Sequence, residues 1–278
     1  MIKNILKKLI YVIFFPYILL LTSFLPEKKI YNSFFKDHFS SLYKTKLELN
    51  KLLILGNYYW LPYILQKKII SASMGNELES IAWAEYYRKK GFPDEDTKYI
   101  KGYDYLKSYI LKNKNKNCHI HQICASSGRE ISYFSKISEI ITFEASDFSK
   151  SVVNNIKNHY PNLKTYYIDL SKHTEVVELA KRCDLIVAFG GLQYLIPREL
   201  ENFFKICKEQ SCEIIIANPL ASELQINKFY KSIPRGNFSW SHPYLYIASQ
   251  YGYKTYQFNT YQNPNYLWAK TLSAHFIN

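Results

Sequence analysis

The stretch His119–Pro219 constrains the fold most, because short apolar runs alternate there with helical patterns four times over. Each apolar run stops near a polar residue or a glycine, among them Gly128, Asp147, Asp169 and Gly190. This alternation is typical of βαβ units built around a parallel sheet. Ligands bind such sheets at the carboxyl ends of the strands, where the chain order reverses. We therefore expect a binding site at these strand ends.

The remaining patterns complete the predicted architecture. The fold class is α/β, with a Rossmann-like, mostly parallel sheet closed by an antiparallel hairpin over Tyr253–Phe258 and Tyr266–Leu272. A helix is predicted over about 98–111, since Tyr103, Leu106 and Ile110 share one face. The chain then divides into an apolar, helical and basic region at 1–70, a helical cap or linker at 71–117, and the Rossmann-like domain at 118–278.

The cysteines and the charge distribution narrow the class of protein. The five cysteines form no CxxC pair, and most lie in apolar runs, which indicates reduced, buried thiols. Of the net charge of +13, residues 1–117 carry 20 basic against 10 acidic side chains, and residues 118–278 carry 16 against 13. The excess reflects either compositional bias or contact of the N-terminal third with an anionic surface.

The N-terminal region is predicted to attach to a membrane. Leu9–Leu25 is uncharged but contains Pro16, and a second apolar run, Leu52–Leu65, follows. The first run is barely long enough to span a bilayer, and a central proline kinks or breaks a helix. Residues 1–70 carry 11 lysines against 3 acids, which favours an anionic inner leaflet. We expect either a short anchor or a monotopic hairpin on the cytoplasmic side; an apolar subdomain of a soluble protein is the alternative.

The loop Gln122–Gly128 resembles the loop after strand 1 of the class I S-adenosylmethionine-dependent methyltransferases, and the resemblance extends over residues 118–278. In that family an acidic residue precedes alternate glycines that let the backbone approach the methionine part of the cofactor. Here Gln122 stands at the acidic position, Cys124 and Ser126 stand at glycine positions, and only Gly128 is retained. The loop is therefore degenerate, and a positive φ at Cys124 or Ser126 would cost energy.

Three further strand ends carry the resemblance. Asp147 would accept the two ribose hydroxyls, as a carboxylate can, with Glu144 as a rival. Asp169 would meet the adenine amino group, and Cys183–Leu195 resembles the segment that closes over the cofactor. The resemblance implies S-adenosyl-L-methionine as cofactor, bound by Gln122, Cys124, Ser126, Gly128, Asp147, Phe148, Asp169, Leu170 and Gly190.

The acceptor side of such a site is built after strands 4 and 5. A hydroxyl acceptor needs a base, and the candidates are His242 and Tyr194, with Asn218 behind them. A structural histidine beside Pro243 is equally consistent with the pattern at His242. No residue identifies the acceptor, but membrane attachment favours a lipid-linked or surface-glycan precursor over a diffusing metabolite.

Other classes fit the sequence less well. A nicotinamide-binding domain needs the motif G-x-G-x-x-G, which Cys124–Gly128 does not supply. The sequence contains no nucleic-acid-binding module, so no nucleic acid partner is expected. His119 and His121 suggest a metal pair, but without a third ligand we interpret them as core or helix-contacting histidines and predict no metal. The alternative from another class is a non-catalytic, membrane-associated scaffold that keeps a degenerate methyltransferase fold.

Overall fold

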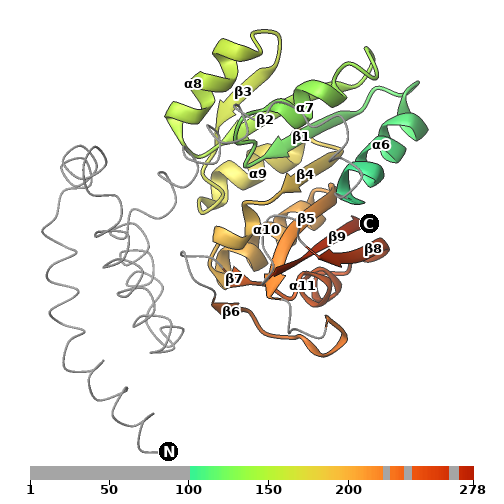
Figure 1. The fold of residues 1–278 in the computed structure, drawn as a ribbon, viewed down its shortest axis with the longest axis vertical. Helices are drawn as coiled ribbons and strands as arrows, with labels where there is room; N and C mark the ends of the chain where they lie inside the picture. Colours follow the sequence, from blue (N-terminus) through green and yellow to red (C-terminus); the bar gives the residue numbers. More distant parts are fainter. Residues whose placement is uncertain (1–100, 222–225, 235–239, 263–268) are drawn as a thin grey trace, which may run out of the picture. The chain divides into compact units, whose positions relative to one another are not determined.

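The computed structural model describes residues 101–221, 226–234, 240–262 and 269–278 (Figure 1). The two apolar runs, the predicted membrane-associated region and the first part of the predicted helical cap lie outside these residues. Among the helices that are described, none is long and apolar enough to cross a membrane.

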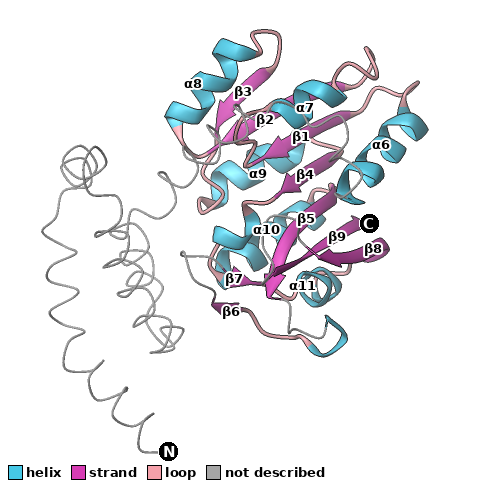
Figure 2. Cartoon of the chain, viewed as in Figure 1, coloured by secondary structure: helices cyan, strands magenta, loops and turns pink. Residues whose placement is uncertain are grey.

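Helices and strands alternate from Lys101 to Ala221 (Figure 2). The strands are β1 His119–Ile123, β2 Thr142–Asp147, β3 Lys164–Tyr167, β4 Leu185–Phe189, β5 Glu213–Ala221, β6 Ile233–Pro234, β7 Trp240–Ser241, β8 Lys254–Gln262 and β9 Ala269–Ile277. The helices are α6 Lys101–Asn113, α7 Arg129–Phe134, α8 Lys150–His159, α9 His173–Arg182, α10 Pro197–Glu209 and α11 Tyr244–Gln250, with short 3₁₀ turns η3 Leu192–Tyr194 and η4 Ile226–Lys228.

Seven of these strands form one sheet, in the order β3-β2-β1-β4-β5-β9-β8. The first five are parallel to their neighbours, whereas β9 pairs antiparallel with both β5 and β8. This arrangement confirms the predicted Rossmann-like sheet with an antiparallel closing hairpin. The chain order reverses between β1 and β4, so the expected ligand position is at the carboxyl ends of these two strands.

Two strand boundaries differ from the predicted ones. The sequence of Glu139–Ala145 predicts a strand that begins at Glu139, but pairing of His119 with Thr142 places the first residue of β2 three positions later. Asp147 is therefore the last residue of the strand and not part of the following turn. The closing strand β9 runs to Ile277, because Phe276 pairs with Ile214 near the start of β5 and Ile277 pairs with Lys254 of β8.

Two hydrophobic layers enclose the sheet. One layer packs α6, α7 and α8 against strand residues such as Ile120, Val187 and Ile215. The other packs α9, α10 and α11 against residues such as Ile123 and Ile216. Because both faces are covered, the central strands are apolar on both sides, which is why β4 reads Leu-Ile-Val-Ala-Phe without alternation.

Helix α6 reaches the carboxyl ends of the strands. Tyr103, Leu106 and Ile110 are buried, as the shared face predicts. The Tyr103 ring lies edge-on to Phe189, the last residue of β4, with ring centroids 4.6 Å apart. Gly102 lies so close to Phe189 and Ala217 that a Cβ there would come within 3.0 Å of both side chains. The start of α6 is therefore packed at the edge of the sheet where the site is expected.

Replacing Gly128 by alanine tests how tightly the loop after β1 packs. Gly128 has a φ of +72°, and an added Cβ would lie 2.7 Å from Cγ2 of Ile156 in α8. We expect Gly128→Ala to lower the free energy of unfolding by about 2–5 kcal/mol, combining the left-handed conformation with overpacking. Gly252→Ala is the control: φ is +81°, but the nearest atom, Cε of Lys208, is 3.7 Å away. Its expected cost in denaturant titration is about 1–2 kcal/mol.

Candidate cofactor site

The loop after β1 keeps the backbone path of a glycine-rich turn without most of the glycines. Cys124, Ser126 and Gly128 have φ angles of 51°, 52° and 72°. These are the alternate positions at which the resemblance places glycine. A non-glycine residue in this region costs about 1–2 kcal/mol. The loop therefore holds a strained conformation at two positions, as is common where a backbone is shaped to receive a ligand.

The side chain of Cys124 lies against the loop that follows β4. A Cβ on Gly191 would lie 2.3 Å from Cβ and 2.5 Å from Sγ of Cys124, and the φ of Gly191 is +93°. Only glycine fits at position 191. Burial, together with the charge of Asp147, raises the pKa of the Cys124 thiol well above its usual value, so the thiol is neutral. Cys124 thus joins the loops after β1 and β4 by packing and not by thiolate chemistry.

Asp147, the last residue of β2, holds the neighbouring loop in place. Its Oδ2 accepts a hydrogen bond from the backbone N–H of Ser126 at 3.1 Å, and its Oδ1 accepts one from Ser149 N–H at 3.1 Å. Its own backbone carbonyl accepts from the N–H of Ile168 at 3.1 Å. Asp147 is 3% exposed. A carboxylate offers about four acceptor positions, so these bonds are compatible with a further bond to a ribose hydroxyl.

The other predicted contacts on this side of the site lie after β2 and β3. Phe148 directly follows Asp147 and is partly buried, and Leu170 is buried. Asp169 is partly buried; its Oδ1 accepts from Ser171 N–H at 3.0 Å, and its own N–H donates to Glu175 Oε2 at 2.6 Å. Asp169 therefore sits in a turn fixed by local hydrogen bonds.

Glu144, the rival of Asp147, lies elsewhere. It is the third residue of β2 and pairs with His121, so it is not at the carboxyl end of the strand. Its Oε1 accepts from the Tyr166 hydroxyl at 3.0 Å, and its Oε2 lies 3.0 Å from His119 Nε2. Burial alone would raise the pKa of Glu144, but its polar contacts with the two histidines and Tyr166 lower that pKa to about 2. Between the two acids, Asp147 has the placement that a cofactor contact requires.

Gly190 borders the same edge on the side of β4. Its N–H donates to the carbonyl of Ala217 at 2.8 Å, and its φ is +84°. The nearest atom to a Cβ added there is Nε2 of Gln193, 4.0 Å away, so the space above Gly190 is open. An open position at the switch point of the sheet is where a ligand can approach the backbone.

Buried polar atoms at this edge test whether the residues suit a polar cofactor. In the part of the chain that the structure describes, several side-chain atoms here are buried without a hydrogen-bond partner. They are Gln122 Oε1, Ser126 Oγ, Ser127 Oγ, Gln193 Oε1, and both Oδ1 and Nδ2 of Asn218. Leaving a polar group buried and unsatisfied costs about 1–3 kcal/mol. Donors and acceptors of this kind fit a ligand that carries hydroxyl, amino and carboxylate groups.

The two predicted catalytic residues lie near one another in the fold. His242 is fully buried; its Nε2 is 3.0 Å from the carbonyl oxygen of Leu195, the residue after Tyr194. Its Nδ1 is 2.8 Å from the hydroxyl of Ser232. Because a carbonyl only accepts, Nε2 carries the proton and Nδ1 accepts from Ser232. His242 acts here as a positioning residue, and it would have to give up one of these bonds to accept a proton.

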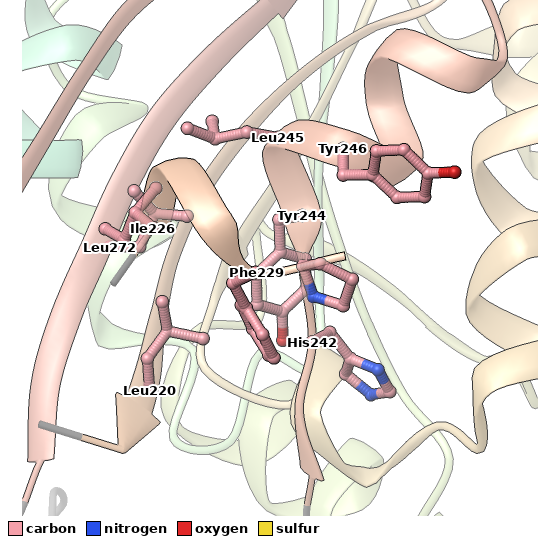
Figure 3. A pocket seen from close by; sticks show the side chains of 9 residues that line it. Leu220, Ile226, Phe229, His242, Tyr244, Leu245, Tyr246 and Leu272 are labelled. Carbon is pink, nitrogen blue, oxygen red and sulfur yellow. The ribbon is translucent and has the colours of Figure 1, made fainter. Parts of the chain in front are cut away.

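A small pocket adjoins His242 on the side of α11 (Figure 3). Leu220, Ile226, Phe229 and Leu272 supply apolar walls, and His242 and Tyr244 also line the pocket. Tyr194 is partly buried and closes the 3₁₀ turn that begins at Leu192, next to Gly191. The pocket thus lies beyond β5, on the side where an acceptor was predicted.

Sequence reasoning did not single out Gln193 or Ser127. Each residue follows a strand end within the stretch that resembles the methyltransferases. The only sequence signal for a functional role was a polar side chain among apolar or small residues. Asn218, ranked last among the acceptor-side candidates, is 0% exposed with an amide that makes no hydrogen bond to the described residues. Burial of an unsatisfied amide cannot be recognised before the fold is known.

Among known proteins, the likeness of this chain is to solved structures of low sequence identity. No protein-family model and no curated protein matches the chain. The methyltransferase domain of bacterial CtHen1-CN is 17% identical with a TM-score of 0.45, covering 62% of this chain and 96% of that one. An S-adenosylmethionine-dependent methyltransferase from Clostridium acetobutylicum is 10% identical with a TM-score of 0.48, covering 64% and 91%. A TehB-like enzyme from Corynebacterium glutamicum is 16% identical with a TM-score of 0.47, covering 73% and 100%.

Exchanging Ser126 for glycine tests the strain in the loop. Glycine removes the cost of about 1–2 kcal/mol that serine carries in the left-handed conformation. It also stabilises the unfolded chain by about 0.5–1 kcal/mol, because glycine has more conformational entropy to lose on folding. We expect Ser126→Gly to raise the free energy of unfolding by about 0.5–1 kcal/mol in denaturant titration without ligand. Ser127→Gly is the matched control, because its hydroxyl is also buried without a partner but its φ is not positive. It should destabilise by about 0.5–1 kcal/mol; equal effects would contradict a strained loop.

Proposed function

We propose that the chain is an S-adenosylmethionine-dependent methyltransferase. The observation that carries the proposal is the loop Cys124–Gly128, which takes positive φ at three alternate residues and is held by the Asp147 carboxylate. A chain that only needed to connect β1 to α7 would have no reason to keep two strained non-glycine residues. The buried polar atoms at the same edge give further support, since a polar ligand would satisfy them.

The residues present suggest how the cofactor would be held. Asp147 would accept from the ribose hydroxyls, and Asp169 would lie toward the adenine. The loop after β1 would present its backbone to the methionine part, with Gly190 open beside it. The cofactor supplies a sulfonium-bound methyl group as the electrophile. The chain contributes mainly by aligning an acceptor with that methyl group, an effect worth roughly 7–11 kcal/mol in well-oriented reactions.

A hydroxyl acceptor must also lose a proton as the new bond to carbon forms. Tyr194 of η3 and Asn218 of β5 would flank the acceptor. Because His242 is bonded to Ser232 and to the carbonyl of Leu195, its contribution in this conformation is to hold η3 and thereby Tyr194. Substitution of His242 should therefore affect the position of the acceptor as well as the rate.

We further propose attachment to the cytoplasmic face of a membrane through residues 1–70, with a lipid-linked or surface-glycan precursor as acceptor. The support comes from the sequence: two apolar runs and 11 lysines against 3 acids in this region. The cofactor is made in the cytoplasm, which agrees with a catalytic domain on that side. The second candidate function, a non-catalytic membrane scaffold, is favoured by the replacement of two loop glycines by Cys124 and Ser126.

Binding of S-adenosylhomocysteine distinguishes the enzyme from the scaffold. Calorimetric titration of the full chain should give micromolar affinity, and Asp147→Ala should weaken it more than tenfold, since both ribose bonds and the loop anchor are lost. Glu144→Gln, which alters the rival acid, and Glu178→Gln, which alters an exposed side chain of α9, should retain the affinity of the parent. Absence of binding by a folded parent chain would favour the scaffold.

Membrane attachment is tested with vesicles. The full chain should co-sediment with vesicles that contain anionic lipid, and a variant lacking residues 1–70 should stay in the supernatant. Basic residues near an anionic surface contribute about 1 kcal/mol each. Raising the salt concentration should therefore weaken binding of the full chain. Equal sedimentation of both chains would show that residues 1–70 are not the attachment region.

A further inference from the structure

A second polar cluster lies toward the opposite end of the strands from the candidate cofactor site. It contains His119 and His121 of β1, Glu144 of β2, and Cys183, which directly follows α9. One ligand atom from each histidine and the sulfur of Cys183 all lie within 4.8 Å of one another. Oε2 of Glu144 lies 3.0 Å from His119 Nε2 and 3.4 Å from His121 Nδ1. Two histidines and a cysteine thus form a group of metal-binding type, and a carboxylate oxygen of Glu144 lies beside both histidines.

The inward-facing atoms are buried and lack aligned partners. His121 is 0% exposed and Glu144 is 4% exposed. Within the described residues, His119 Nε2, His121 Nδ1 and Glu144 Oε2 are buried without a hydrogen-bond partner, although they lie close together. Three such atoms facing one another cost about 1–3 kcal/mol each if nothing satisfies them. A shared cation would satisfy all three.

The outward-facing atoms of the same groups are already bonded in the way that metal ligands require. His121 Nε2 lies 2.9 Å from the Ser146 hydroxyl, so donation of its proton there leaves the Nδ1 lone pair directed inward. Glu144 Oε1 accepts from the Tyr166 hydroxyl, which leaves Oε2 for the cluster. Hydrogen bonds of this kind fix the tautomer and the orientation of metal ligands.

The separations suit a tetrahedral zinc ion. With bonds of about 2.0–2.1 Å to nitrogen or oxygen and about 2.3 Å to sulfur, neighbouring ligand atoms lie about 3.3–3.8 Å apart. The distances from Glu144 to the two histidines are already close to that range. The two histidine nitrogens and the Cys183 sulfur lie within 4.8 Å of one another. To bind one ion, the two most distant of these atoms have to approach each other by at most about 1.5 Å, which side-chain rotation can supply.

We propose that His119, His121, Cys183 and Glu144 form a structural zinc site. Four protein ligands close the coordination shell, which is typical of structural and not of catalytic zinc. Binding would convert the Cys183 thiol to a thiolate and release its proton to solvent. The ion would tie the start of β1 to β2 and to the segment that enters β4. It would thus stabilise the strands whose opposite ends form the cofactor site.

Among the described contacts of this cluster, Arg182 is the one positively charged neighbour, and it would repel a bound cation. Its Nε lies 3.7 Å from Glu144 Oε2, and its guanidinium lies over the Tyr166 ring, 4.4 Å from the centroid. The Arg182 side chain is 35% exposed, so it can turn toward solvent when the ion binds. Removing the charge of Arg182 should change the zinc affinity in the opposite direction to removing a ligand. Arg182→Gln should tighten zinc binding, whereas loss of a ligand should weaken it.

The experiment uses the full chain, stripped with a chelator and dialysed against Zn²⁺ alone. After gel filtration, metal analysis should find one zinc per chain in the parent and in Cys212→Ser, a buried cysteine outside the cluster. His119→Ala and Cys183→Ser should lose at least tenfold in affinity. Zinc at a hundredfold excess over its dissociation constant should raise the unfolding temperature of the parent by roughly 5–10 °C.

Cobalt substitution keeps the proposal testable if a variant fails to fold. The Co²⁺ form of the parent should show tetrahedral d–d bands and a thiolate-to-cobalt charge-transfer band, and Cys212→Ser should show the same spectrum. Absence of the charge-transfer band in the parent, or equal zinc retention by the parent and Cys183→Ser, would overturn the proposal. None of these readouts depends on S-adenosylmethionine binding, so failure of the proposed function would leave the zinc site standing.

Discussion

The hydrogen bonds of the Asp147 carboxylate organise the candidate cofactor site. One oxygen binds the N–H of Ser126 in the loop after β1, and the other binds the N–H of Ser149 at the start of α8. These bonds join two loops that α7 and β2 separate along the chain. The left-handed residues of the first loop depend on that support, since Cys124 and Ser126 have no intrinsic preference for positive φ. The shape of the site is therefore maintained by the same acid that is expected to bind the cofactor.

The order of the strands and the buried face of α6 could be predicted because they follow from hydrophobic periodicity. The apolar runs predicted the parallel strands, and the spacing of Tyr103, Leu106 and Ile110 predicted the buried face of α6. The start of β2 was predicted three residues early, because apolar Ile140 and Ile141 extend the run while strand pairing alone decides where it begins. The length of β9 depends in the same way on its partner β5.

The spacing of residues along the sequence could not show which side chains from distant segments come together in the fold. His119 and His121 were interpreted as core histidines for want of a third ligand, but the sulfur of Cys183, more than sixty residues away in the chain, lies within 4.8 Å of a ring nitrogen of each. His242 was considered as a base on its residue type, yet its two ring nitrogens are bonded to Ser232 and Leu195. In both cases the chemistry depends on contacts between distant segments, which periodicity does not encode.

A crystal structure of the full chain with S-adenosylhomocysteine tests the central claim most directly. The ribose hydroxyls should lie within hydrogen-bond distance of the Asp147 carboxylate, with the homocysteine part over Cys124–Gly128 and the adenine toward Asp169. The amide of Asn218 or Gln193 should gain a partner from the ligand or from an ordered water beside it. A ligand bound elsewhere, or a saturated crystal with no ligand at this edge of the sheet, would contradict the account.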